Sequence, residues 1–255
     1  MSVRLTPRDF TALAVLSEHY GAPLDLVAEM HGVSRRSAYR MAQRWREAVM
    51  IGPLLQPVPG PAWVVPTATT AEGFLGFTAR HWVPTPKMLD HVTTVLRVRL
   101  ALVGLDSERW ISERTLRHEV GPTKLGTARP HIHDGRYIDA EGRWWAVEVE
   151  LSPKTAHATA RASVAAAHRA ASVAGCHGLV YYCRGERVKD IIREAAKGLD
   201  LSGTVARLDD LDRLLANPLV GPQAQPPLRL VVGGPPAANQ RTARKNDRGQ
   251  PRDKP

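Results

Sequence analysis

Apolar side chains recur at helical spacing in three segments near the beginning of the chain. The first segment begins after Thr6, a residue type that caps helices, and ends at Gly21. The second spans residues 24–31, and the third begins after Ser34 and runs to about Met50. A short turn that contains glycine separates the second from the third, which is typical of a helix-turn-helix.

A pair of strands is predicted directly after the third helix. Residues 54–58 and 62–65 are rich in apolar side chains and flank the turn sequence Pro59-Gly60-Pro61. A helix-turn-helix that is followed by such a hairpin predicts a winged helix-turn-helix domain over residues 1–80.

Further along the chain, strands and helices alternate. Residues 144–151 alternate between apolar and polar side chains, and residues 178–183 form the continuous apolar run of a buried strand. The Ala-rich segment 155–174 between them is predicted to be a helix, and a helix, a short strand and a last helix are predicted to follow. This order indicates an α+β or α/β fold with a central mixed sheet over residues 86–217.

A long amphipathic helix is predicted over residues 87–103, between these two regions. Its apolar side fits two roles. It could begin the second domain, or it could pair two copies of the chain in a homodimer.

Composition excludes several classes of protein. The 255 residues correspond to one or two domains, and two cysteines are too few for a disulfide framework, which favours a reducing cytoplasm. No apolar run is long enough for a transmembrane helix, so no membrane partner is expected. Beyond Pro218 the composition shifts to Pro, Gly, Gln and Arg, which predicts a disordered basic tail over residues 218–255.

The charge balance favours a polyanionic partner. The sequence has 35 Lys and Arg against 25 Asp and Glu, a net charge of +10, which is typical of proteins that bind double-stranded DNA. The alternative is a basic surface that has no polyanionic partner and reflects only a preference for Arg over Lys in the composition. The third predicted helix has no acidic residue between Ser34 and Arg46, whereas a solvated helix face normally mixes charges. The residues predicted to contact DNA are Arg35, Arg36, Arg40, Arg44 and, on the later Ala-rich helix, Arg161.

Acidic side chains gather around two predicted strands. Asp134 precedes one strand, and Glu148 and Glu150 lie on one face of the next, because side chains alternate along a strand. Three converging carboxylates would bind Mg²⁺, with Mn²⁺ as a substitute, and such an ion supports hydrolysis of a phosphodiester bond. Lys154 would then hold the attacking water or neutralise phosphate charge, and Glu113 is a further acidic candidate. The alternative is a solvated sheet face on which the carboxylates pair with arginines.

Three other kinds of site are not favoured. His131-x-His133-Asp134 resembles the start of a zinc-hydrolase site, but no later cluster of His, Cys or Asp has ligand spacing. Cys176 and Cys183 lie in or beside a predicted buried strand, which favours a place in the core. The sequence has no glycine-rich phosphate loop, so no nucleotide cofactor is expected.

The arrangement of Asp134, Glu148 and Glu150 on adjacent strands resembles the PD-(D/E)xK nuclease fold. His133 stands where that motif has proline, and Glu150 stands where it has the catalytic lysine. The resemblance makes Lys154 a candidate substitute for that lysine. It supports the fold more strongly than the activity, because many members of the superfamily are inactive.

The order of the segments also resembles the replication-relaxation family of actinobacterial plasmids and integrative elements. The resemblance covers residues 8–200 and implies a cytoplasmic protein of mobile DNA that acts in replication initiation, relaxation or transfer. The matching segments are Trp63-Val64-Val65-Pro66-Thr67, Glu72-Gly73, Leu89-Asp90-His91, Ser112-Glu113-Arg114, His131 to Gly135 and Val147 to Lys154.

Two functions are therefore expected. The first is a DNA-binding protein of a mobile element, with metal-dependent DNA cleavage at the acidic residues as an added activity. The alternative is a winged-helix transcriptional regulator in which an inactive nuclease-like domain serves dimerisation.

Overall fold

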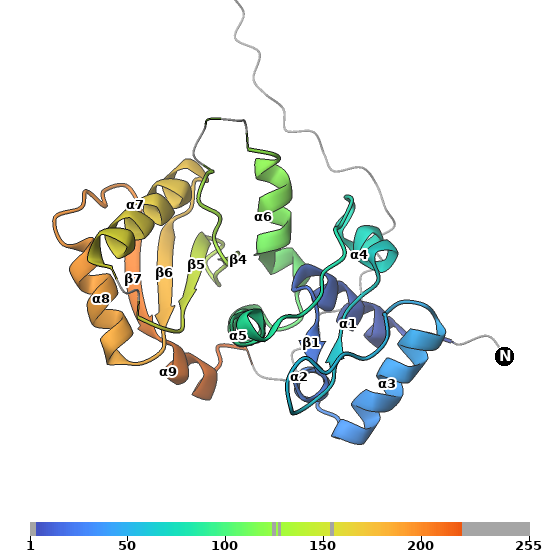
Figure 1. Ribbon diagram of the computed structural model, residues 1–255. Helices are drawn as coiled ribbons and strands as arrows, with labels where there is room; N and C mark the ends of the chain where they lie inside the picture. Colours follow the sequence, from blue (N-terminus) through green and yellow to red (C-terminus); the bar gives the residue numbers. More distant parts are fainter. Residues whose placement is uncertain (1–3, 124–125, 127–128, 154–155, 221–255) are drawn as a thin grey trace, which may run out of the picture.

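A computed structural model describes residues 4–123, 126, 129–153 and 156–220 (Figure 1). It has a helical N-terminal part and a five-stranded sheet flanked by helices, which confirms the predicted mixture of α and β structure. Within these ranges no helix has both the length and the apolar character needed to cross a membrane.

The helices of the N-terminal part begin and end where the sequence marks them. Thr6 accepts a hydrogen bond from the Asp9 backbone N–H and donates its own N–H to the Asp9 carboxylate, which makes a capping box. Ser34 caps the third helix by accepting from Ser37 N at 3.2 Å, and Gly32 ends the second helix with a left-handed φ of 56°. The elements are α1 (Pro7–Glu18), β1 (Ala22–Pro23), α2 (Leu24–His31), α3 (Arg35–Glu47), β2 (Trp63–Val64) and α4 (Ala68–Leu75).

The strands of this part are very short. β1 pairs antiparallel with β2, and isolated bridges join Ile51 to Pro66 and Leu55 to Trp63. The hairpin predicted over residues 54–65 is thus present as bridges rather than as a regular ladder, because its several prolines cannot donate backbone hydrogen bonds. The two residues of β1 are too few to show an alternating pattern, and the sequence did not predict that strand.

The second part contains the central mixed sheet that the sequence predicts. Its strands follow the order β3-β4-β5-β6-β7, with antiparallel pairing from β3 to β5 and parallel pairing from β5 to β7. The strand β3 and the helix α6 after it were not predicted. The elements are α5 (Pro86–Val103), the 3₁₀ helix η1 (Ser107–Arg109), β3 (Trp110–Ser112), α6 (Glu113–Val120), β4 (Gly135–Ile138), β5 (Trp144–Glu150), α7 (His157–Val173), β6 (Gly178–Cys183), α8 (Glu186–Ala196), β7 (Val205–Asp210) and α9 (Leu211–Ala216).

Helices cover both faces of this sheet (Figure 1). Trp145, Val147 and Val149 of β5 point to the face that α5 and α9 cover. Ala146 points to the opposite face, where alanines and valines of α7 and α8 pack. Side chains alternate between the two faces along a strand, so those of Glu148 and Glu150 leave β5 on the same face as that of Ala146, beneath α7 and α8.

The long helix α5 packs against both parts of the molecule. Leu96 belongs to the core formed by α1, α2 and α3, whereas Val98 and Leu102 belong to the core beneath the sheet. Arg99 is fully buried and pairs with Glu18 of α1, with 2.5 Å between Nη1 and Oε2. Of the two roles that its sequence allows, α5 therefore has an intramolecular one in this structure.

Tryptophan packing fixes the beginning of β4, which is the strand next to the candidate site. A Cβ atom placed on Gly135 would lie 2.2 Å from the ring of Trp110. Real Cβ atoms do not approach a neighbour so closely, so only glycine lets β4 pair with β3 at this point. Asp134, the residue before it, is thereby held at the end of the β4–β5 ladder.

Candidate functional sites

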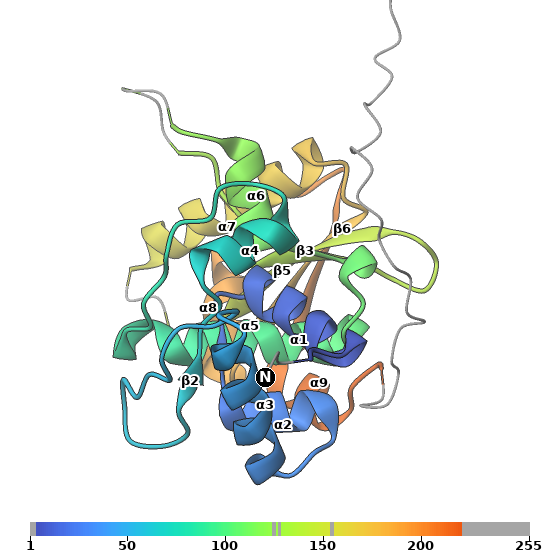
Figure 2. The same ribbon diagram turned by 90° about the vertical axis from the view of Figure 1, so that its right-hand side faces the viewer.

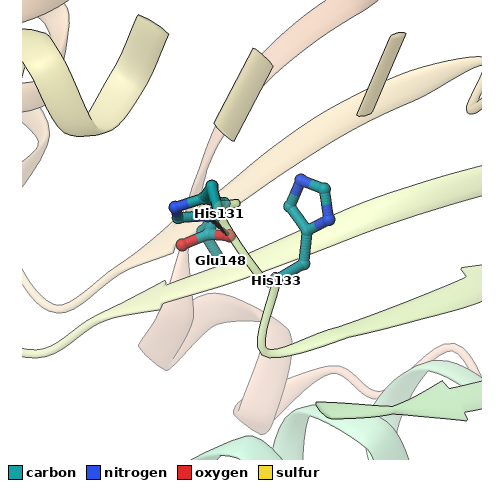
Figure 3. Close-up of side chains that lie close together, drawn as sticks. All are labelled: His131, His133 and Glu148. Atoms are coloured by element: carbon teal, nitrogen blue, oxygen red, sulfur yellow. Dashed lines mark hydrogen bonds and ion pairs between the residues drawn. The ribbon is translucent and has the colours of Figure 1, made fainter. Parts of the chain in front are cut away.

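Two histidines and a glutamate lie close together at the end of β4 (Figure 3). The potential ligand atoms of His131, His133 and Glu148 all lie within 4.8 Å of one another, and we call this group the His–Glu cluster. The histidines come from the segment before β4, and Glu148 comes from the middle of β5. Among the described residues, this is the group of three such side chains whose ligand atoms lie close enough to hold a metal ion.

Glu148 and His131 form a buried hydrogen-bonded pair. His131 Nε2 lies 2.7 Å from Glu148 Oε1, and the Glu148 residue is only 7% exposed. Burial raises the pKa of Glu148 above its usual value, and the charges of Asp134 and Glu150 act in the same direction, while the hydrogen bond with His131 opposes them. The carboxylate therefore needs a cationic or hydrogen-bonding partner to remain ionised in this position.

His133 is held in one orientation and one tautomer. Its Nε2 lies 3.0 Å from the backbone oxygen of Ala167 on α7, and a carbonyl oxygen can only accept, so Nε2 carries the hydrogen. Burial lowers the pKa of His133 to about 4, so the ring is neutral at pH 7 and Nδ1 presents a lone pair. His133 is fully buried, and its Nδ1 has no hydrogen-bond partner among the described residues.

Asp134 is fully occupied by other contacts. Its Oδ2 accepts from Val149 N at 2.8 Å, in the place of a carbonyl of the β4–β5 ladder, and its Oδ1 lies 3.0 Å from His91 Nε2 on α5. The hydrogen bond with Asp134 raises the pKa of His91 to about 8, so the His91 ring is protonated at pH 7.

Glu113 lies beside this ion pair. It begins α6, pairs with Arg117 and accepts a hydrogen bond from Tyr20 at 3.3 Å. Together with His91 and Asp134 it lines a small cavity of about 20 Å³, which is room for roughly one water molecule.

The predicted carboxylate site and the observed His–Glu cluster share one residue. Asp134 and Glu150 influence Glu148 by their charges, but the three carboxylates are not among the described groups whose ligand atoms lie within one coordination sphere. The site with Mg²⁺ at these three residues stays a prediction, and Lys154 lies outside the described residues. The sequence did not favour a zinc site at His131, because no later cluster of His, Cys or Asp has ligand spacing. That reasoning did not consider Glu148, on the next strand, as a possible ligand.

The helix α3 lies at the outer edge of the N-terminal part, away from the sheet (Figures 1 and 2). The buried side of the helix is apolar, with Ala38, Met41, Ala42 and Trp45. The exposed cations of the helix are Arg35, Arg36, Arg40 and Arg46, of which Arg36 and Arg40 lie opposite the buried side. None of the ion pairs formed by the described residues involves these four side chains.

Arg44 has a structural partner. Its Nη2 lies 3.1 Å from Oδ1 of Asp9, which also accepts from Trp45 Nε1 at 2.7 Å. Burial opposes ionisation, but hydrogen bonds from Thr6 and Trp45 and the charge of Arg44 hold the pKa of Asp9 below its usual value. This contact fixes α3 against α1. Beside it lies a pocket of about 390 Å³ lined by Thr6, Arg8, Asp9, Ser37, Arg40, Met41 and Arg44.

Arg161, the fifth arginine predicted to contact DNA, is engaged elsewhere. Its guanidinium donates to the backbone oxygens of Ala195, Lys197 and Gly198 at the end of α8. Cationic side chains commonly satisfy the free carbonyls of a helix C-terminus in this way. The structure therefore gives Arg161 a role in joining α7 to α8.

Comparisons with known proteins name no relative. The resemblance to the replication-relaxation family thus stays a prediction that rests on the segments quoted above. No family model, curated protein or solved structure matches the chain.

Proposed function

We propose that the protein binds double-stranded DNA through α3. The observation that carries this proposal is the set of exposed arginines on α3, because Arg35, Arg36, Arg40 and Arg46 take part in none of the ion pairs of the described residues. Long cationic side chains on one helix face reach phosphates and the edges of guanine in the major groove.

The surrounding elements support a winged helix. The order α1, β1, α2, α3 and then the bridged segment 51–66 matches a helix-turn-helix with a following hairpin, and β1 pairs with the last strand of that hairpin. α2 and α3 are joined by a turn through Gly32, as in a helix-turn-helix. The buried contact of Arg44 and Trp45 with Asp9 holds α3 with its arginines directed to solvent.

The sheet part supports a nuclease-like domain in the same proposal. It has an antiparallel run of three strands and then a parallel strand after a crossover helix, with Asp134 before β4 and Glu148 and Glu150 on β5. This arrangement is similar to the PD-(D/E)xK nuclease fold. With the resemblance to the replication-relaxation family, it favours a protein of mobile DNA that acts in replication or transfer.

The alternative is a winged-helix regulator whose nuclease-like domain does not cleave DNA. A specific observation favours it, because Asp134 and Glu148 are each hydrogen-bonded to a histidine and not assembled with Glu150 into a carboxylate site. The two functions share the DNA-binding face of α3 and differ in cleavage.

DNA binding is tested by replacing Arg35, Arg36 and Arg40 together with alanine. Fluorescence anisotropy with a labelled random duplex, measured over a series of salt concentrations, should show weaker binding and a flatter log–log salt dependence. Each lost phosphate contact removes about 0.9 from that slope. Unchanged affinity and slope would exclude α3 as the DNA-binding element.

A matched variant controls for net charge. Arg187, Arg193 and Lys197 are exposed cations of the α8 region, and their replacement by alanine removes the same three charges far from α3. We expect this variant to keep most of the affinity. Equal losses in both variants would show that only the net charge of the molecule matters.

Cleavage is tested by incubating the protein with supercoiled plasmid in Mg²⁺ or Mn²⁺. Nicking that Glu148→Gln abolishes would favour the nuclease, whereas DNA binding without nicking in either metal would favour the regulator. Glu148→Gln should leave DNA binding intact, because Glu148 lies in the sheet part.

A further inference from the structure

The His–Glu cluster has a feature that hydrogen bonding within the protein does not explain. Glu148 and His131 satisfy each other across 2.7 Å, and Ala167 accepts the hydrogen of His133 Nε2. Nδ1 of His133 remains, in a fully buried residue and without a partner in the part of the chain that the structure describes. Buried polar atoms usually have a partner, and an ion bound at this nitrogen would supply one.

A second buried polar atom lies on the neighbouring strand. Tyr181 of β6 is in register with Glu148 of β5, so both side chains leave the sheet on the face beneath α7 and α8. The hydroxyl oxygen of Tyr181 is also buried without a partner among the described residues. The same face of the sheet thus holds a glutamate and two unsatisfied polar atoms.

The hydrogen bond to Ala167 prepares His133 to bind a metal ion. A histidine ligand commonly donates its other ring N–H to a backbone carbonyl, which fixes the tautomer and the ring orientation. In His133 the donation by Nε2 leaves Nδ1 as the ring nitrogen with a lone pair for an ion.

We propose that His131, His133 and Glu148 bind a divalent transition-metal ion of the Zn²⁺ type, with His133 coordinating through Nδ1. One ring nitrogen of each histidine and a carboxylate oxygen of Glu148 already lie within 4.8 Å of one another, and a bound ion would replace the hydrogen that His131 and Glu148 share. Three protein ligands leave one position of a tetrahedral zinc ion for water or a substrate oxygen.

The donor set selects the class of metal. Two imidazoles and one carboxylate suit Zn²⁺ and its neighbours, whereas Mg²⁺ and Ca²⁺ take oxygen ligands. The side chain of His131 is 20% exposed, so an ion can reach the cluster from solvent. The inference does not depend on DNA binding, because all three ligands belong to the sheet part.

The test uses the full-length protein after dialysis against a chelator. Zn²⁺ is titrated by calorimetry, and Co²⁺ is used as a spectroscopic substitute whose visible absorption reports nitrogen and oxygen ligation. We expect one equivalent of either ion to bind and to raise the melting temperature by mass action. Mg²⁺ at the same concentration should have a much smaller effect. A wild-type protein that shows no binding, or an equal response to Mg²⁺, would overturn the proposal, whatever the variants do.

The sharpest variant is His133→Gln. The glutamine amide nitrogen takes the place of Nε2 and can still donate to Ala167, but the Nδ1 ligand is removed. The affinity for Zn²⁺ should fall by more than the 10- to 100-fold that loss of an outer-shell partner typically costs. His131→Gln should have the same effect. Unchanged Zn²⁺ affinity in both folded variants would overturn the proposal.

His168→Gln is the matched control. His168 lies on α7, is also buried, and its Nε2 also lies 3.0 Å from a backbone oxygen, that of Leu201. It lies outside the His–Glu cluster. We expect this variant to bind Zn²⁺ with wild-type affinity. If it lost affinity as strongly as His133→Gln, the effect would be one of general stability, and the assignment of ligands would be wrong.

Discussion

At the scale of single residues, Asp9 joins local structure to the orientation of the proposed DNA-binding helix. It caps α1 through Thr6, and it accepts from Arg44 and Trp45 of α3. One carboxylate, 1% exposed, therefore determines how two helices meet. Sequence reasoning assigned Arg44 to DNA and did not predict this contact, because the partners are far apart in the sequence.

Asp9→Ala should destabilise the protein by about 2–3 kcal/mol, since it leaves the Trp45 N–H buried without a partner and removes the carboxylate half of the capping box of α1. Urea denaturation measures the loss. Arg44→Ala should cost less than about 1 kcal/mol, because its side chain is 42% exposed and Asp9 keeps its other donors. Equal losses in the two variants would contradict the central role of Asp9.

At the scale of elements, the periodicity of apolar residues predicts the long helices and strands and misses the short strands. α1, α2, α3, β5 and β6 lie where apolar spacing places them. β1 and β3 have two and three residues, too few for any period to appear. The His–Glu cluster was missed for a related reason. The segment that carries His131 and His133 has no regular structure, so no spacing rule tells which strand it faces.

The β3–β4 pairing should depend on Gly135. In Gly135→Ala the new Cβ meets the ring of Trp110, and overpacking of this kind costs about 1–3 kcal/mol. Gly73→Ala is the opposite case, because Gly73 lies in α4 with open space around it and ordinary φ. It should stabilise the protein by roughly 0.5–1 kcal/mol. Melting temperatures that move in the same direction for both variants would contradict this account.

At the scale of the whole molecule, buried neutral histidines should make the protein sensitive to acid. Burial, with the nearby charge of Arg8, lowers the pKa of His31 to about 4. Between the ordinary value of 6.5 and 4, the unfolded chain therefore binds the proton and the folded chain does not. The contribution of His31 is present above pH 6.5 and is lost as the pH falls toward 4.

His31→Asn tests this contribution. The asparagine oxygen can replace Nδ1 as the acceptor of the Arg8 N–H but does not titrate. Urea denaturation at pH 7 and pH 5 should show a loss of stability on acidification that is smaller in the variant by about 1 kcal/mol. The comparison with wild type cancels Glu148, whose raised pKa acts with the opposite sign by favouring the folded state at lower pH. Parallel losses in the two proteins would contradict the assignment.

The place of α5 limits how this protein can be recombined with others. Leu96 and the Arg99–Glu18 pair bind the N-terminal helices to a helix that also covers the sheet. A chimera joined near residue 80 would separate Glu18 from Arg99 and leave a fully buried guanidinium without its counter-ion. A graft of the first 80 residues onto a foreign partner would therefore need α5 as well. Because Val98 and Leu102 of the same helix belong to the core beneath the sheet, removing α5 with the graft would uncover that core in the remaining part.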